Sequence, residues 1–213
     1  MPEPTARIPQ RSHARANRAR ILGTAREELS RNPGANLDEI AQAAGVVRRT
    51  VYGYFPNRHT LIEALVAEAE QALREALAAA HDPKADPATA MARLTLLAWD
   101  LGEQYRMLIA MRHRDLGEER VAAALDPIRK RATSIIARGQ RTGVFGRHLR
   151  PRVLNDVIEA VALALLEHSV ADDEKPVSGA DAATASLVAA GVTPAEASRC
   201  VEAVLADTAT PVS

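Results

Sequence analysis

Two adjacent arginines, a threonine and a tyrosine stand close together in this 213-residue chain, at Arg48, Arg49, Thr50 and Tyr52. A guanidinium carries paired N–H donors that match a phosphate or the O6 and N7 edge of guanine. Hydroxyl groups bond phosphates, and a threonine also contacts the methyl group of thymine. The set is therefore suited to phosphates and base edges, with Arg48 and Arg49 as the candidates for guanine.

The residues before this set predict a short helix and a sharp turn. Asn36 is placed to cap the free N–H groups that open a helix, and Glu39 is placed to reach back, as in a capping box. Apolar residues then follow at the spacing of one helix face, at Leu37, Ile40, Ala41 and Ala44. Gly45 favours the left-handed backbone of a helix exit.

A second helix after this turn would bury Val47, Val51 and Tyr54 and leave the two arginines outside. Two short helices joined by a tight turn are a helix-turn-helix, which commonly places its second helix in the DNA major groove. Each good two-point contact to a base discriminates by about 1 to 3 kcal/mol.

The run Ile-Ala-x-x-Ala-Gly-Val-x-x-x-Thr-Val-Tyr-x-Tyr-Phe-Pro-Asn-Arg-x-x-Leu, at residues 40–61, resembles the DNA-binding domain of the TetR family of transcriptional regulators. The resemblance extends over about residues 15–65. It implies that Tyr52, Tyr54 and Arg58 contact the DNA backbone, and Asn36 is expected to add a phosphate contact at its helix start.

The chain departs from the family in two places. The family usually has small or polar residues where Arg48 and Arg49 stand, and often a bulky residue where Gly53 stands. These departures affect which operator is read more than whether DNA is bound. The expected DNA-binding residues are Asn36, Arg48, Arg49, Thr50, Tyr52, Gly53, Tyr54 and Arg58.

Charge is divided unevenly along the chain, although the formal net charge is zero. Residues 1–59 carry ten arginines and five acidic residues, so the net charge there is +5 and that of the remainder is −5. A basic end favours a polyanionic partner. Residues 1–14 are either a disordered leader or a flexible basic arm whose Arg7, Arg11 and Arg15 touch phosphate or a minor groove.

Composition predicts an all-α protein, because helix formers dominate and no strand-like runs occur. We expect a three-helix domain with the helix-turn-helix at 15–60, whose first helix runs from about residue 14 to 31. A larger helical bundle for ligand binding and dimerisation follows at 61–213, giving about nine or ten helices in total. Its expected helices are 57–80, 88–114, 118–125, 127–141, 151–170, 181–190 and 194–206.

The family resemblance also implies an effector pocket and a dimer interface in the bundle. Candidate ligand residues on the 88–114 helix are Trp99, Glu103, Met107 and Met111, for which ordinary core packing is the alternative. Candidate interface residues near the C-terminal end, which would otherwise belong to the core of the chain itself, are Val157, Val161, Leu165, Val201, Val204 and Leu205.

Metal and catalytic sites are not expected. Cys200 is the single cysteine, and His81, His113, His148 and His168 are scattered singly, so no metal-ligand spacing arises and no cofactor is implied. No apolar run approaches the roughly 20 residues of a membrane span. A cytoplasmic protein is expected, in a reducing compartment compatible with one thiol.

The expected function is a ligand-responsive homodimeric transcriptional regulator that binds a palindromic DNA operator. Repression, with release by a small-molecule effector, follows from the family's usual behaviour and not from these residues. The alternative is a helical-bundle enzyme or small-molecule carrier whose N-terminal domain does not bind DNA.

Overall fold

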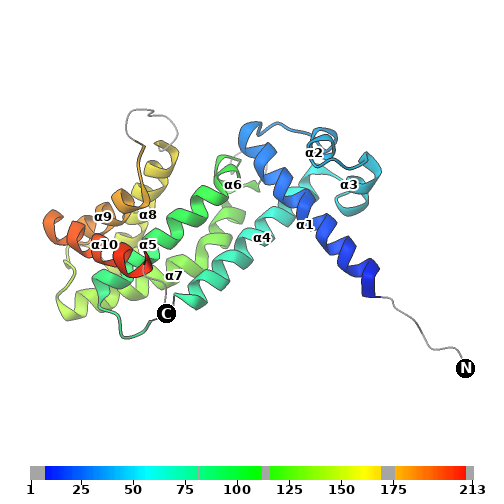
Figure 1. The fold of residues 1–213 in the computed structure, drawn as a ribbon. Coiled ribbons are helices and arrows are strands. Elements are labelled where there is room, and N and C mark those ends of the chain that lie inside the picture. The colour runs from blue at the N-terminus through cyan, green and yellow to red at the C-terminus, as the bar shows by residue number, and fades with distance from the viewer. Residues whose placement is uncertain (1–7, 81, 112–115, 169–175, 210–213) are drawn as a thin grey trace, which may run out of the picture. The chain divides into compact units, whose positions relative to one another are not determined.

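The computed structural model describes residues 8–80, 82–111, 116–168 and 176–209, and all regular structure in these ranges is helical (Figure 1). The helices are α1 (Ile8–Arg31), α2 (Leu37–Ala43), α3 (Arg48–Tyr54), α4 (Arg58–Ala79), α5 (Pro87–Gln104), α6 (Arg106–Ala110), α7 (Glu118–Thr142), α8 (Pro151–His168), α9 (Gly179–Ala189) and α10 (Pro194–Ala209). The all-α prediction and the expected number of helices are confirmed. None of the described helices combines the length and the apolar character of a membrane span.

The chain forms two compact units, and each unit is made of two separate stretches of the sequence. Unit 1 comprises Met1–Ala69 and Tyr105–Val121, and unit 2 comprises Glu70–Gln104 and Ala122–Ser213. Helix α4 therefore contributes its first half to unit 1 and its second half to unit 2. The short helix α6 belongs to unit 1 although α5, just before it in the chain, belongs to unit 2.

The core of unit 1 comes from one face of each of the first four helices. From α1 it takes Ile21, Leu22, Ala25 and Leu29, all at most 2% exposed. Ile40 from α2, Val51 from α3, and Leu61 and Leu65 from α4 are fully buried as well. The spacing of three and four residues in each helix places these side chains on one side, as the sequence predicts.

Helix α1 begins earlier than predicted. It starts at Ile8 and includes Pro9 in its first turn, where a missing N–H costs no helical hydrogen bond. Residues 8–14 are therefore helical. Arg7 and the rest of the proposed arm before Ile8 lie outside the described residues.

Unit 2 is a bundle built around α9, which packs against α5, α8 and α10. Its buried residues include Met91 from α5, Ile136 from α7, Leu154 from α8 and Leu187 from α9. Ser178 and Asp181 form a capping box that opens α9, and Thr193 and Glu196 bond each other at the start of α10. Local start signals and apolar faces thus account for the bundle.

Two further predictions about helix boundaries were wrong. The expected helix 88–114 is interrupted at Tyr105, whose φ and ψ of −115° and 24° are not helical. The expected break at Pro127 is absent, because α7 continues through it. Arg129 donates a 3.0 Å hydrogen bond to the carbonyl of Ala122 and two bonds to Glu159 of α8, which supports α7 around the proline. The hydrogen bonds to the Glu159 carboxylate raise the pKa of Arg129.

Candidate nucleic-acid interface

The start of α2 is fixed by the predicted capping box. The side-chain oxygen of Asn36 accepts from the backbone N–H groups of Asp38 and Glu39 at 2.9 and 3.0 Å. The Glu39 carboxylate accepts from the backbone N–H of Asn36 at 2.8 Å. Because the Asn36 oxygen and backbone N–H are engaged, only its side-chain NH₂ group is left to meet a phosphate.

Gly45 makes the turn between α2 and α3. Its φ of +64° lies in the left-handed region, which glycine adopts without the steric cost that a Cβ brings. Two backbone hydrogen bonds close the turn, from Gly45 to the Gln42 carbonyl at 3.1 Å and from Val46 to the Ala41 carbonyl at 3.0 Å. Helix α3 therefore leaves the turn in one defined direction.

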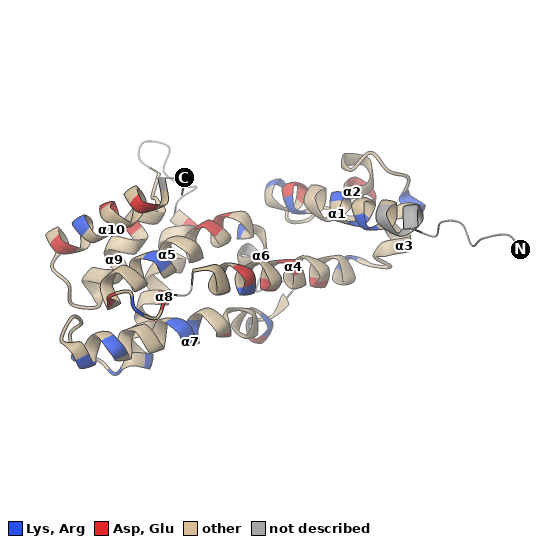
Figure 2. Ribbon diagram, turned by 60° about the horizontal axis from the view of Figure 1, so that its bottom comes forward, with Lys and Arg blue, Asp and Glu red and all other residues tan. Residues whose placement is uncertain are grey.

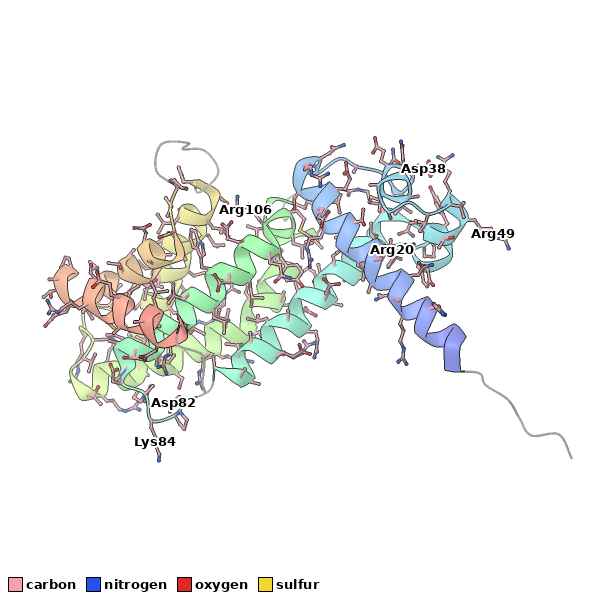
Figure 3. The ribbon with its side chains drawn as sticks, in the orientation of Figure 1. Arg20, Asp38, Arg49, Asp82, Lys84 and Arg106 are labelled. Atoms are coloured by element: carbon pink, nitrogen blue, oxygen red, sulfur yellow. The ribbon has the colours of Figure 1, made fainter. Side chains whose placement is uncertain are left out.

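One face of α3 is buried and the opposite face is open. Val51 is fully buried, whereas Arg49, Tyr52 and Gly53 are exposed. The expected burial of Val47 is wrong, because its side chain is 71% exposed just before α3. These three residues stand at positions i, i+3 and i+4, which share one side of a helix. Figure 3 shows Arg49 extending outward from α3. The exposed face of α3 thus presents a guanidinium, a phenol and an uncovered stretch of backbone.

The two arginines that the sequence pairs differ in their surroundings. Arg49 is exposed and forms no ion pair among the described residues. Arg48 forms an ion pair with Asp38 of α2, through Nε to one carboxylate oxygen and Nη2 to the other. The local sequence pattern predicts both as guanine readers and contains no signal for the ion pair with Asp38.

Tyr54 acts inside the domain. Its hydroxyl donates to the backbone carbonyl of Ala14 in α1 at 3.1 Å, so it ties α3 to α1. Phe55, next in the chain, is 1% exposed and lies under the guanidinium of Arg18, 5.4 Å from the ring centre. The expected contact of Tyr54 with the DNA backbone stays a prediction, and it would require the hydroxyl to exchange the Ala14 carbonyl for a phosphate oxygen.

Arg58 also acts inside the domain. Its Nε donates to the carbonyl of Ala35 at 3.2 Å, and its Nη2 donates to the carbonyl of Pro33 at 2.5 Å. Both carbonyls belong to the loop between α1 and α2. Arg58 therefore braces this loop, and its expected contact with a phosphate stays a prediction.

Three exposed arginines on the first part of α1 extend the basic surface beyond the motif. They are Arg15, Arg18 and Arg20, with Arg20 donating to the side chain of Asn17 at 2.9 Å. The acidic Glu27 and Glu28 follow only toward the other end of α1, and Figure 2 shows both signs of charge on this helix. The sequence pattern predicts Arg15 in the arm and does not single out Arg18 and Arg20, although both contribute to the positive charge of residues 1–59.

A polar cluster in unit 1 joins α1, α4 and the start of α6. Arg26 pairs with Glu68 at 3.0 Å and lies over the Tyr105 ring at 5.5 Å, and the Tyr105 hydroxyl bonds Glu68 at 3.3 Å. Burial raises the pKa of Tyr105, and the nearby Glu68 carboxylate raises it further. Helix α6 also packs against α1. No local sequence pattern predicts this cluster, because its members are far apart in the chain.

The candidate ligand residues are not brought onto one helix face. Trp99 and Glu103 lie in α5 of unit 2, whereas Met107 and Met111 lie in unit 1. Trp99 is 8% exposed and packs against Gly179, where an added Cβ would stand 3.0 Å from the indole ring. Met107 and Met111 are at most 2% exposed. Trp99, Met107 and Met111 are therefore packed as core residues in this structure. Glu103 is exposed.

A small cavity lies elsewhere in unit 2, lined in part by Leu77, Arg93, Leu94 and Arg131. Its volume of about 20 Å³ has room for about one water molecule. Drug-sized ligands occupy pockets of about 300 to 1,000 Å³, so this cavity is too small for one. Among the described residues, no group of three or more His, Cys, Asp or Glu is placed to hold a metal ion.

The candidate interface residues fall into two groups. Val157 of α8 and Leu205 of α10 are 42% and 41% exposed, and Val161 and Leu165 are half-buried. Val201 and Val204 are each 2% exposed and belong to the core of unit 2. These last two are therefore corrected to core residues, since they present almost no surface to another molecule.

Part of the chain matches a known protein family. Residues 21–65 match the model of the bacterial regulatory proteins of the tetR family. No curated protein sequence is significantly similar to the chain.

Solved structures share the fold over most of the chain. A TetR family transcriptional regulator, PfmR from Thermus thermophilus, has 18% identity and a TM-score of 0.68, over 81% of this chain and 98% of that one. FadR from Bacillus subtilis, solved with stearoyl-CoA, has 18% identity and a TM-score of 0.67, over 82% and 98%. RolR (NCGL1110), solved with resorcinol, has 22% identity and a TM-score of 0.53, over 95% and 97%.

Proposed function

The N-terminal domain of this chain is a TetR-family domain, and we propose that the chain is a homodimeric DNA-binding transcriptional regulator that responds to a small molecule. The observation that carries the proposal is the exposed face of α3. Arg49, Tyr52 and Gly53 share this face, while Val51 anchors the opposite side in the core. A helix held in this way fits the DNA major groove.

The residues of the motif divide their work between DNA and the domain. Arg49 reads a guanine edge, Tyr52 bonds a phosphate, and Thr50, which is half-buried, contacts a thymine methyl or a phosphate. The exposed arginines of α1 add phosphate contacts. Tyr54 and Arg58 keep α3 and the loop before α2 in position.

A second copy of the chain pairs with the first through the exposed apolar side of α8 and α10. Val153 and Val157 are 37% and 42% exposed and stand one helical turn apart, and Leu205 on α10 is 41% exposed. These two valines and one leucine lie on helices that both pack against α9, and exposed apolar side chains of this kind support an interface. A two-fold dimer presents two α3 helices to the half-sites of a palindromic operator, about 34 Å apart.

An effector binds within the helical bundle and changes DNA affinity. Structures that share this fold were solved with resorcinol or stearoyl-CoA, which supports a small-molecule site here without naming the molecule. The Arg26, Glu68 and Tyr105 cluster joins α6 to α1 and α4, so a shift of α6 would reach the DNA-binding helices. The effector acts only as far as it binds the two states with different affinity.

In this scheme the regulator works in the cytoplasm, where bacterial DNA lies, and represses until the effector releases it. A thermal-shift screen tests for the effector, since a ligand at 100 times its dissociation constant stabilises the folded protein by about 2.7 kcal/mol.

A mobility-shift assay on the DNA that flanks the chain's own gene tests the proposed function. We expect retardation that resists competition by random DNA of the same length, and Arg49→Ala should weaken this resistance while still retarding DNA at low salt. Phosphate contacts are strongest at low salt. If the unmodified protein retards no DNA even there, the proposed function is wrong and an enzyme or carrier without DNA binding takes its place.

A further inference from the structure

Asp38 and Arg48 bring an acidic group and a basic group together within the helix-turn-helix. Asp38 stands in the first turn of α2 and Arg48 opens α3, so their ion pair spans the turn at Gly45. The Arg48 side chain is 70% exposed and that of Asp38 is 33% exposed. Exposed ion pairs add little to stability. The place of this pair, beside the exposed face of α3, points instead to a role in DNA binding.

The geometry of the pair leaves half of the guanidinium available. Of the five N–H donors of an arginine, Asp38 engages one on Nε and one on Nη2. The remaining three lie on Nη1 and Nη2. One donor from each of these two atoms forms the outer edge of the group, which has the spacing of the O6 and N7 acceptors of guanine.

Resting on the proposed function, we propose that Asp38 is a positioning residue that holds Arg48 in the orientation that reads a guanine. An arginine side chain with several rotatable bonds loses rotamer freedom when it binds. Because Asp38 fixes the plane of the guanidinium before DNA arrives, less freedom is lost on binding. The carboxylate also repels phosphate, so Arg48 is directed to a base edge and not to the backbone.

Arg49 provides the contrast inside the same helix. It is exposed and has no ion-pair partner among the residues that the structure describes. Arg48 is thus a pre-oriented reader and Arg49 a mobile one. The operator should therefore be read most strictly at the base that Arg48 meets.

Selection from a DNA duplex library with a randomised central segment tests this assignment, with sequencing of the bound fraction. The unmodified protein should enrich a guanine at one position of each half-site that depends on Arg48. Arg48→Lys keeps the positive charge but loses the paired donors of the guanidinium, so it should reduce that preference about tenfold or more. Asp38→Asn should reduce it about two- to tenfold at the same position and leave the others unchanged.

Glu39→Gln is the matched control. It adds the same unit of positive charge on the same helix turn, and Gln still accepts the capping-box hydrogen bond. Both variants should bind random DNA more tightly, but Glu39→Gln should keep the guanine preference. Circular dichroism and thermal unfolding check that each variant is folded.

The possible outcomes separate the two proposals. If the unmodified protein enriches no sequence, the proposed function fails and this inference fails with it. If it enriches an operator but Asp38→Asn keeps the full preference, or Arg48→Lys changes no position, the proposed function stands and the role of Asp38 is wrong. A loss spread evenly over all positions would also overturn it, because that is the effect of a structural residue.

Discussion

The hydroxyl of Tyr54 donates a hydrogen bond to the backbone carbonyl of Ala14, 3.1 Å away, and so joins the end of α3 to the first turns of α1. Tyr54→Phe removes this bond alone. We expect it to lower the free energy of unfolding by about 0.5 to 1.5 kcal/mol, as for a typical hydrogen bond. Urea unfolding measures the change. DNA affinity should fall little for the folded variant. A large loss of affinity at unchanged stability would instead indicate that Tyr54 contacts the DNA backbone.

Arg58 makes a second prediction, because it braces the loop before α2 through the carbonyls of Ala35 and Pro33. Arg58→Ala should destabilise the domain by about 1 to 3 kcal/mol, since hydrogen bonds from a charged donor are lost. Arg31→Ala is the control, because its ion pairs with Glu27 and Glu28 are exposed and contribute about 0 to 1 kcal/mol. Equal stability of the two variants would contradict the bracing role.

A third prediction concerns Gly53, where no described neighbour would clash with a larger side chain. A Cβ added at Gly53 meets no atom within 4 Å, and Gly costs a helix about 1 kcal/mol relative to Ala. Gly53→Ala should therefore raise the unfolding temperature and lower DNA affinity, because the bare backbone admits DNA closely. Gly23→Ala in α1 is the matched control, since its added Cβ also meets nothing within 4 Å.

Gly23→Ala should stabilise the protein without changing DNA affinity. If Gly53→Ala binds DNA as tightly as the unmodified protein does, the close approach at Gly53 is wrong.

A fourth prediction concerns the dimer. Val157→Glu places a charge on the exposed apolar side of α8 and should yield monomers by light scattering. Loss of simultaneous binding to two half-sites should weaken operator binding about a hundredfold or more. Val144→Glu is the control, because Val144 follows α7 and is 38% exposed, similar to Val157 at 42%. A dimeric Val157→Glu protein would exclude this side of α8 as the interface.

A fifth prediction follows from the raised pKa of Tyr105, which has burial as its first cause. The unfolded chain releases the phenol proton near pH 10, whereas the folded protein retains it to higher pH. The contribution of Tyr105 to stability is therefore fully present below pH 10 and is lost as the pH rises through the folded pKa. Tyr105→Phe should lose stability less steeply above about pH 10. Unfolding titrations at several alkaline pH values test this, with Tyr52→Phe as the control for removal of a phenol elsewhere.

The helix-turn-helix was predictable because its signals are local. The capping box at Asn36, the turn at Gly45 and the buried Val51 each depend on residues a few positions apart. The caps at Ser178 and Thr193 are local as well, since each lies three residues from its partner, although the predicted start at residue 181 is two residues later than the start of α9. Local backbone chemistry decides such features, so a sequence reveals them.

The remaining features depend on partners far along the chain. The interruption at Tyr105 has no proline beside it, and Gly102 lies inside α5 without ending it. Tyr105 bonds Glu68 from another helix. Helix α7 continues through Pro127 with the support of Arg129 and its partner Glu159. Tyr54 and Arg58 bond backbone carbonyl groups, and a pattern of side chains does not predict which carbonyl groups these are. Tertiary contacts decided each of these, and periodicity does not encode them.

The return of residues 105–121 to unit 1 limits how this protein can be recombined with others. A chimera that grafts only the first 69 residues onto a foreign body would leave Arg26 and Glu68 without Tyr105 and would uncover the side of α1 that α6 covers. A transplantable DNA-binding head must therefore bring its own 105–121 segment, or meet a host segment that offers a tyrosine in its place. To exchange its DNA-binding domain with that of another regulator, two separate segments of this chain must be replaced together.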